Sequence, residues 1–420
     1  MTTSRAVVIL TLLALASACV LALLSRAPAS LRDVDRDAAA TDPSLGAHFD
    51  DQVIERHGAF RRSAYASLAL GIVVQITALV ILMRGPAARL VDAIESWPGG
   101  WAVHAFVVGA LLAIALTLML LPISFIQGYV VQHAWHLSTQ DVAGWVGDRL
   151  RSGAVRAVLG GVAALAFFGV VRWQPRTWWL VGWAVFTALS AALTFLWPLV
   201  IAPLFNRFTV LEPGPTRARV LELASDAGED VGEVYVIDAS RRSTVENAYV
   251  AGIGSSKRVV LYDTLLQAGD LDETSFIVAH ELGHQVKDHV YKNVALTAVG
   301  LFVGFGVLYL LAGNGSIWER AGASGISDLR ALPVLLLFVL IANLISLPIE
   351  STISRAHERQ ADAIALDLTH DPDTAVRVFR RLAFANLADL RPPPIVEWAL
   401  FSHPPIPDRI RAAMEAVRTP

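Results

Sequence analysis

The chain is 420 residues long, with 55% hydrophobic residues, only 17% charged residues and a mean hydropathy of +0.52. This balance excludes an ordinary soluble protein and indicates an integral membrane protein. A formal net charge of −3 argues against a nucleic-acid partner, and the single cysteine, Cys19, excludes an intrachain disulfide or a cysteine-based zinc site.

Apolar runs long enough to cross a bilayer recur along the chain and predict a polytopic helical membrane protein. About seven spans are expected: Ala6–Leu24, Ala64–Met83, Val103–Leu121, Ala154–Val171, Trp178–Trp197, Val294–Ala312 and Leu332–Ile349. The first span could be a lipoprotein signal cleaved before Cys19, but its apolar run continues to Leu24, which favours an uncleaved anchor. The charged stretch that follows, Arg26–Arg62, is expected to be disordered.

The arginines between the spans predict an orientation in the membrane. With residue 1 outside, the inner loops hold Arg26, Arg32, Arg36, Arg56, Arg61, Arg62, Arg149 and Arg151, and the outer segments hold Arg5, Arg84, Arg89, Arg172, Arg176, Arg320 and Arg330. This excess places residues 205–293 and the tail after Glu350 in the cytoplasm. Basic charge is nearly all arginine, a composition that we associate with a bacterium, so a bacterial plasma membrane is expected.

The soluble stretch between the fifth and sixth spans has a small α/β pattern. An amphipathic helix is expected first and three short strands after it: Arg217–Ala227, then Val234–Ile237, Asn247–Val250 and Arg258–Tyr262. Asp270 with Glu273 three residues later forms a capping box that begins another helix. Because no breaker follows before Val294, this second helix is expected to continue straight into the sixth span.

That second helix carries the sequence His280-Glu281-Leu282-Gly283-His284. Histidines four residues apart share one helical face and can hold one metal ion, and a glutamate beside the first can take a proton from a water on that metal. This H-E-x-x-H pattern is typical of zinc peptidases. The alternative is a chance pairing of two histidines, so a third ligand decides between them.

The third ligand is expected from another helix that faces the first. After the seventh span, Glu358 and Asp362 lie on one helical face, so Glu358 is the candidate ligand and Asp362 the candidate acceptor for the free N–H of a ligand histidine. The alternative is a solvated helix next to the membrane. His357 lies about 100° round the helix from Glu358 and is not expected to bind metal. His289 falls on a different face from His284 and is assigned to the membrane interface.

Several segments occur in a fixed order: Pro198–Phe208, Val236–Ser243, Asn247–Tyr249, Lys257–Leu265, His280–His284, Glu358-x-Gln360-Ala361-Asp362, and His403-Pro404-Pro405 with Arg409. In order and spacing this series resembles the type 1 CAAX prenyl protease family, which are integral-membrane zinc metallopeptidases of the gluzincin kind. The resemblance extends from about Gly128 to the C-terminus. Residues before it match only as apolar spans.

The resemblance implies a role for each matching residue. One Zn²⁺ per chain would be bound by His280, His284 and Glu358. The implied catalytic residues, with Glu281 as general base, are Glu281, Asn247, His403 and Arg409, the last two near the oxyanion or supporting the zinc glutamate. The substrate backbone would be bound as an added strand by Asn247, Ala248 and Tyr249.

Some positions depart from the family pattern. Val245-Glu246 precede Asn247 where serine or histidine is more frequent, and His357 and Arg359 flank Glu358 where an aromatic residue is common. None of these positions is a proposed ligand. The departures therefore bear on substrate choice and not on the metal.

The expected fold is mainly α, a polytopic membrane protein of about seven transmembrane helices with a small α/β zinc metallopeptidase module. The resemblance implies that these helices enclose a chamber. The expected parts are a membrane domain (1–204), a cytoplasmic catalytic module (205–293), the last two spans (294–350) and a C-terminal catalytic segment (351–420). The expected partners are the bilayer and a peptide or protein substrate cleaved at the membrane surface, lipidated substrates included. A transporter and a zinc-containing scaffold without activity are the alternatives.

Overall fold

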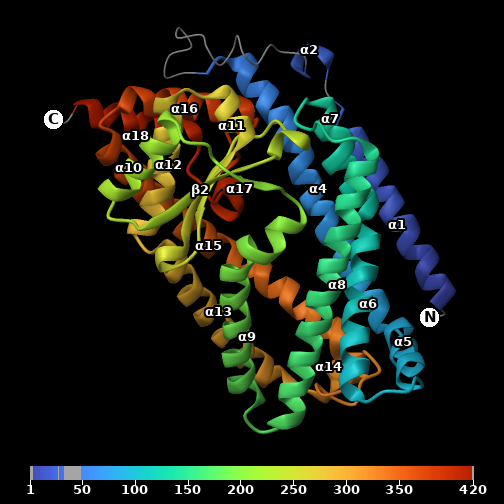
Figure 1. Cartoon of the computed structure of the whole chain (residues 1–420). Coiled ribbons are helices and arrows are strands. Elements are labelled where there is room, and N and C mark those ends of the chain that lie inside the picture. The colour runs from blue at the N-terminus through green and yellow to red at the C-terminus, as the bar shows by residue number, and fades with distance from the viewer. Residues whose placement is uncertain (1–2, 27, 33–48, 419–420) are drawn as a thin grey trace.

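The computed structural model describes residues 3–26, 28–32 and 49–418, which form a helical bundle with a small α/β module at one end (Figure 1). The first half contains α1 (Thr3–Leu24), α2 (Ala29–Arg32), α4 (Asp51–Met83), α5 (Pro86–Glu95), α6 (Trp101–Phe125), the π-helix η1 (Ile126–Val131), α7 (Gln132–Ala134), α8 (Val142–Trp173), α9 (Trp178–Leu196), the π-helix η2 (Trp197–Ile201) and η3 (Ala202–Leu204).

The second half of the chain contains the module and the last long helices. Its elements are β1 (Phe208–Val210), α10 (Pro215–Asp226), β2 (Val231–Ile237), η4 (Ala239–Arg241), β3 (Ala248–Ala251), η5 (Gly254–Ser256), β4 (Lys257–Tyr262), α11 (Asp263–Ala268), α12 (Leu271–Val286), α13 (His289–Ala312), α14 (Gly315–Glu319), η6 (Leu329–Ala331), α15 (Leu332–Thr369), α16 (Pro372–Ala385), α17 (Pro394–Leu400) and α18 (Ile406–Arg418).

Seven helices among the described residues are long and apolar enough to cross a membrane, and each contains one of the expected spans. The expectation of disorder up to Arg62 is wrong from Asp51 onward, because α4 already begins there. Polar side chains in its first turns have partners within the protein: His57 Nδ1 lies 2.7 Å from the carbonyl oxygen of Ala388, and Arg61 Nε donates to that of Leu387 over 2.7 Å. Residues 33–48 of the charged stretch lie outside the described residues.

The module is built on a four-stranded sheet of order β1-β2-β4-β3. The central strands β2 and β4 are parallel, and the outer strands β1 and β3 pair antiparallel with them. All three expected strands are present, whereas β1, only three residues long, was not expected. Strand β3 is an edge of this sheet, which leaves one side of its backbone without a strand neighbour among the described residues.

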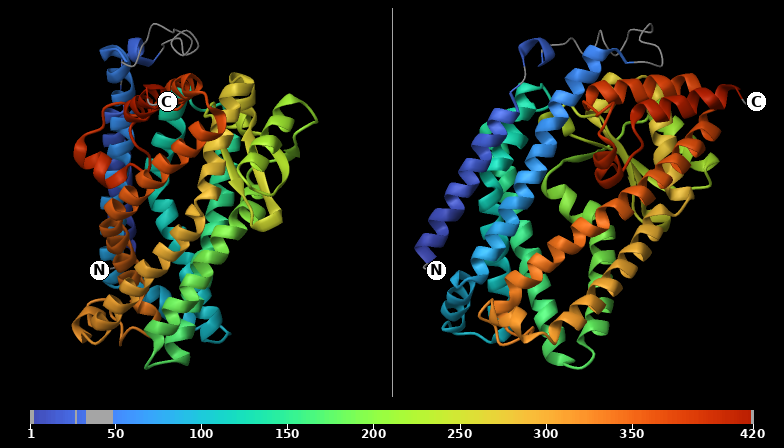
Figure 2. Two further views of the ribbon diagram at one scale, coloured as in Figure 1. Left: turned by 90° about the vertical axis from the view of Figure 1, so that its left-hand side faces the viewer. Right: turned by 180° about the vertical axis from the view of Figure 1, so that it is seen from behind.

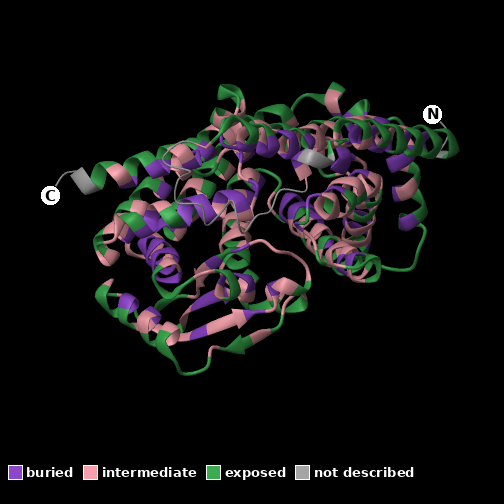
Figure 3. Cartoon of the chain, turned by 90° about the horizontal axis from the view of Figure 1, so that it is seen from above, coloured by how far each residue is buried: buried purple, intermediate pink, exposed green. Residues whose placement is uncertain are grey.

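The two faces of the sheet have different coverings. Buried side chains of β2 and β4, such as Val234, Val259 and Leu261, pack with those of α10, α12, α16 and α18 in one hydrophobic core. The opposite face carries tyrosines, including Tyr249 of β3 and Tyr262 of β4, around the buried Ile237 and Val260. Seen from above in Figure 3, the module lies beside the bundle, and buried residues concentrate where elements face one another.

The expectation that the helix of His280 continues into the sixth span is wrong. Helix α12 ends at Val286, and α13 begins at His289. Between them Asp288 adopts the left-handed conformation, with a φ of 54°, and this interrupts the helical hydrogen bonding. Aspartate tolerates this conformation better than most residues, so the sequence allows a sharp turn without a glycine or proline. The ligand helix and the sixth span are therefore separate elements.

Helix α15 joins the seventh span to the module in one piece of 38 residues. Pro348 lies inside it without ending it, so the boundary expected near residue 350 falls within a continuous helix. Figure 2 shows α15 running obliquely from the far end of the bundle to the module. Glu358 is consequently carried on the same rigid element as the last membrane span.

A second connection ties the module to α8. Asp148 of α8 accepts a hydrogen bond from Arg242 Nε over 2.6 Å, and the side chains of both residues are less than a fifth exposed. Arg242 also donates to Asn206 Oδ1 over 2.6 Å. Next to this ion pair, Ser138 and Ser243 form an isolated β-bridge. These contacts fix the segment that leads into β3 against the membrane domain.

Candidate metal centre

Three potential metal ligands, His280 and His284 of α12 and Glu358 of α15, converge at the crossing of these helices. The two Nε2 atoms lie 3.2 Å apart, and Glu358 places Oε2 3.3 Å from Nε2 of His280 and Oε1 3.4 Å from Nε2 of His284. All three ligand atoms lie within 4.8 Å of one another. The structure thus brings together the set expected from the sequence, although α12 and α15 are separated by the sixth span.

The donor atoms fit a metal ion. Among the described residues, Glu358 Oε2 is buried and has no hydrogen-bond donor in suitable geometry. Two imidazole nitrogens and one carboxylate oxygen that face a common point repel one another through their lone pairs unless a cation lies between them. Two nitrogens and one carboxylate are also the protein ligands of catalytic zinc sites that keep an open position.

Asp362 lies behind His280, as expected. Its Oδ1 is 2.9 Å from His280 Nδ1, an ion-pair contact that orients this imidazole with its Nε2 toward Glu358. Arg409 donates to both carboxylate oxygens, with Nε 2.9 Å from Oδ2 and Nη2 2.6 Å from Oδ1. The guanidinium carbon of Arg409 lies 4.3 Å from the ring centre of Phe379. Arg409 therefore supports Asp362 directly.

The expectation that His289 lies on a different face from His284 is wrong. Its side chain is only 2% exposed, and its Nδ1 lies 2.9 Å from Nδ1 of His284. The left-handed Asp288 allows this contact, because on a continuous helix residue 289 would point away from the face of His284. The sequence signal for this turn was Asp288 itself, since aspartate readily adopts the left-handed conformation.

His403 completes the group from the loop between α17 and α18. Its Nε2 lies 3.3 Å from Glu358 Oε2, while its Nδ1 is 2.8 Å from the Ser402 hydroxyl. Helix α15 holds this loop, because Arg355 donates to the carbonyl oxygens of Glu397 and Phe401 over 2.7 and 2.8 Å. The His403 side chain is 58% exposed, so it borders the open side of the site.

Charge at the centre depends on burial. Without a cation between the ligands, the carboxylates of Asp362 and Glu358 outweigh the effect of burial and raise the pKa of His280 to about 9, so a bound metal ion would take the place of that proton. Burial also raises the pKa of Glu281, although the neighbouring histidines act in the opposite direction. A carboxylate with a raised pKa is a stronger base than an exposed one, which suits a residue that accepts and returns a proton.

The expected substrate-binding segment lies next to α12, on the edge strand β3. The side-chain Oδ1 of Asn247 accepts a hydrogen bond from the backbone N–H of Ala248 over 2.9 Å. The backbone carbonyl oxygen of Asn247 accepts a hydrogen bond from the backbone N–H of Tyr262. These contacts place the Asn247 side chain against its own strand. Its role toward a substrate stays a prediction.

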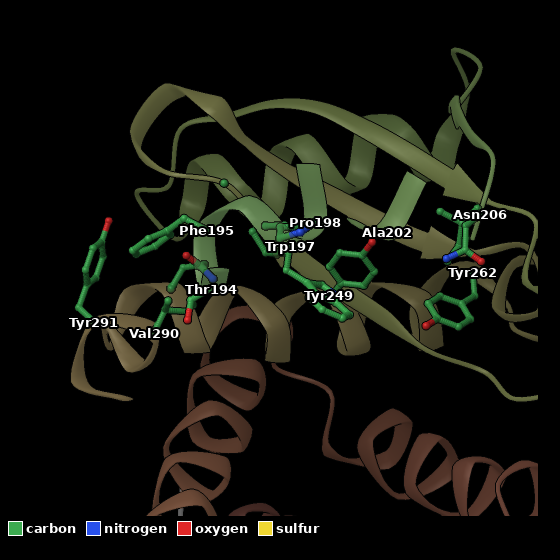
Figure 4. A pocket seen from close by; sticks show the side chains of 15 residues that line it. Thr194, Phe195, Trp197, Pro198, Ala202, Asn206, Tyr249, Tyr262, Val290 and Tyr291 are labelled. Atoms are coloured by element: carbon green, nitrogen blue, oxygen red, sulfur yellow. The ribbon is translucent and has the colours of Figure 1, made fainter. Parts of the chain in front are cut away.

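A cavity of about 550 Å³ lies on the tyrosine face of the sheet. Figure 4 shows Tyr249 and Tyr262 beside it, with Trp197 and Pro198 of η2 and Tyr291 of α13 along its wall. No charged residue lines it within the described part of the chain. The cavity connects strand β3 to the ends of the fifth and sixth spans.

This chain is similar to known proteins over most of its length. Residues 214–417 match the model of peptidase family M48, and residues 35–207 match that of the CAAX prenyl protease N-terminal region with five membrane helices. An uncharacterized metalloprotease of Bacillus subtilis is 34% identical over 74% of this chain and 73% of its own length. The chain belongs to peptidase family M48.

Other relatives of this M48 peptidase carry more specific names. CAAX prenyl protease 1 of Saccharomyces cerevisiae is 30% identical over 72% of this chain and 70% of its own. The crystal structure of Ste24p from S. mikatae shares the fold, with a TM-score of 0.78 and 24% identity over 97% of this chain and 98% of that one. This fold fits the expected helices around a chamber. The M48 peptidase is thus a multi-pass membrane metalloprotease.

Proposed function

We propose that this chain is a zinc-dependent endopeptidase of a bacterial plasma membrane, with its catalytic module in the cytoplasm. The observation that carries the zinc assignment is the convergence of His280, His284 and Glu358, with Asp362 behind the first histidine. When bound, Zn²⁺ would polarise the scissile carbonyl group and lower the pKa of a water molecule. Side chains of the protein transfer the protons and stabilise the oxyanion.

Glu281 acts as the general base in this proposal. It lies next to His280 on α12, and its raised pKa favours accepting a proton from the attacking water. The same carboxyl then returns the proton to the nitrogen of the leaving amine. His403, on the exposed side of Glu358, donates a hydrogen bond to the oxyanion of the tetrahedral intermediate. Asp362 and Arg409 hold His280 in its orientation.

The substrate is a peptide or protein segment that binds as an extra strand along β3. The free edge of β3 supplies backbone hydrogen-bonding groups, with Ala248 and Tyr249 at its beginning and Asn247 just before it. The uncharged cavity beside Tyr249 accepts an apolar group of the substrate. Since the cavity borders the ends of two membrane spans, substrates anchored in the bilayer can reach it, with or without an attached lipid.

Glu281→Gln tests the mechanism. Loss of cleavage in this variant would exclude the transporter and scaffold alternatives. The variant should retain zinc at one equivalent and lose about 10²–10⁴-fold in cleavage of a peptide library, because glutamine cannot accept the proton. Asp272→Asn, on the exposed first turn of the same helix, is the matched control and should cleave normally. Unchanged cleavage by the zinc-loaded Glu281→Gln protein would refute the proposed role of Glu281.

A further inference from the structure

His289 is a buried polar residue that the mechanism above does not use. Its Nδ1 faces Nδ1 of the ligand His284 at 2.9 Å, and its Nε2 faces Oε1 of Gln360 at 3.2 Å. The ring of His357 stacks on it with centres 4.0 Å apart and planes inclined by 14°. His289 therefore connects a metal ligand on α12 to a neutral amide on α15.

One arrangement of protons satisfies all of these contacts. His284 directs Nε2 toward Nε2 of His280 and toward Glu358, so as a neutral ligand it carries its hydrogen on Nδ1. That hydrogen points at His289, whose own Nδ1 must then be bare and accept it. His289 consequently carries its hydrogen on Nε2 and donates to the Gln360 amide oxygen, which is an acceptor only.

The contacts that α15 makes differ between the two ligand histidines. Helix α15 serves both ligand histidines from different faces: Glu358 and Asp362 face His280, whereas Gln360 and His357 face His289. Each ligand histidine thus has its own support, a carboxylate for His280 and a neutral chain for His284.

We infer that His289 and Gln360 are positioning residues, which fix His284 with Nε2 toward the metal through the chain His284–His289–Gln360. This inference rests on the proposed metal site, but it concerns how the protein holds one ligand and not what the enzyme cleaves. Supports of this kind typically change metal affinity by about 10–100-fold when they are removed. The same loss is expected here.

The test measures zinc affinity of the purified full-length protein by competition with a chelator, together with kcat and KM. His289→Phe keeps a planar ring but has no acceptor, and should weaken zinc binding by about 10–100-fold and lower kcat with KM little changed. His289→Asn places an amide oxygen near the position of Nδ1, and should restore affinity to within a few-fold of the original protein. Gln360→Met removes the second acceptor and should weaken zinc binding by a smaller factor.

The controls separate positioning from folding. Asn293→Ser, at an exposed and uncharged position on the first turns of α13, should leave zinc affinity unchanged, and metal-free His289→Phe protein should melt close to the metal-free original. Equal zinc affinity in His289→Phe and the original protein would overturn the inference while leaving the proposed function intact. Equal losses of zinc affinity in His289→Phe and His289→Asn would also overturn the inference, because they would show that His289 acts through packing and not as a hydrogen-bond acceptor. Failure of the original protein to bind zinc would overturn both.

Discussion

Asp362 shows how a residue that does not itself bind the metal can orient one that does. Its carboxylate faces His280 Nδ1 and is itself clamped by two bonds from Arg409. Burial of the pair makes the bonds strong, because few water molecules compete for the same atoms. A change at Asp362 should therefore appear first in metal binding.

Asp362→Asn should weaken zinc affinity by about 10–100-fold, since a neutral amide supports the imidazole less well than a carboxylate and leaves Arg409 without its charged partner. Chelator competition on the purified protein measures this. Asp367→Asn, at an exposed position on the next turns of α15, is the control. Retention of full zinc affinity in Asp362→Asn would show that His280 does not depend on this carboxylate.

The crossing of α12 and α15 decides whether the ligands meet. At Gly283, an added Cβ would lie 2.9 Å from Cα and 3.0 Å from the carbonyl oxygen of Ala361. Those are backbone atoms, so the clash cannot be relieved by rotating a side chain. The helices approach this closely only because residue 283 has no side chain, and this brings His284 within reach of Glu358.

Gly283→Ala should push the helices apart, lower stability by about 1–3 kcal/mol and impair zinc binding. Thermal unfolding and metal analysis of the purified variant measure the two effects. Gly300→Ala on α13, where an added Cβ meets no atom within 4 Å, should change neither. Normal zinc content in Gly283→Ala would indicate that the crossing tolerates a wider spacing than we infer.

A buried ion cluster links three further elements of the module. Arg381 of α16 lies 3.1 Å from Glu246, which precedes β3, and 3.0 Å from Glu273 of α12. Burial raises the pKa of Glu246 to about 7, with Arg381 acting against the shift and Glu273 adding to it. Between about pH 4.5 and pH 7, the folded protein therefore keeps a proton on Glu246. The unfolded chain, in which the pKa of this carboxyl is near its ordinary value of 4.5, has already released it.

Stability should accordingly fall as pH rises from about 4.5 to about 7 and then level off, because the folded state binds the extra proton only in this window. The size of the effect is on the order of 3 kcal/mol. In Glu246→Gln this part of the pH dependence of the melting temperature should disappear, whereas the exposed control Glu222→Gln should keep it. A pH profile of Glu246→Gln identical to that of the original protein would contradict the assignment to Glu246.

Orientation is a property of the whole molecule. The arginine distribution predicts that the module faces the cytoplasm and that the segment between the sixth and seventh spans faces outward. In a Cys19→Ser background, a cysteine at exposed Ser316 should react with a membrane-impermeant thiol reagent on intact bacterial cells. A cysteine at exposed Glu212 should react only after the cells are opened. The reverse pattern would invert the proposed topology.

Much of this fold followed from the sequence because its signals are local. A span is recognised from its own apolar length, and strands such as Val234–Ile237 from their own β-branched residues, so both were located. Elements that depend on neighbours were not. Strand β1 has three residues and exists through its pairing with β2, and polar side chains at the beginning of α4 form hydrogen bonds with the backbone of residues 387 and 388.

The sequence by itself determined the chemistry of the centre: the two histidines and Glu281 share one helix, and Glu358 and Asp362 share another, because helical periodicity places residues four apart on one face. Only the tertiary structure decided how those faces meet. The left-handed Asp288 turns His289 onto His284, Gly283 lets α12 and α15 touch, and α15 carries both Glu358 and the loop of His403. These contacts join residues on different elements, and no local pattern specifies the distance between two helices.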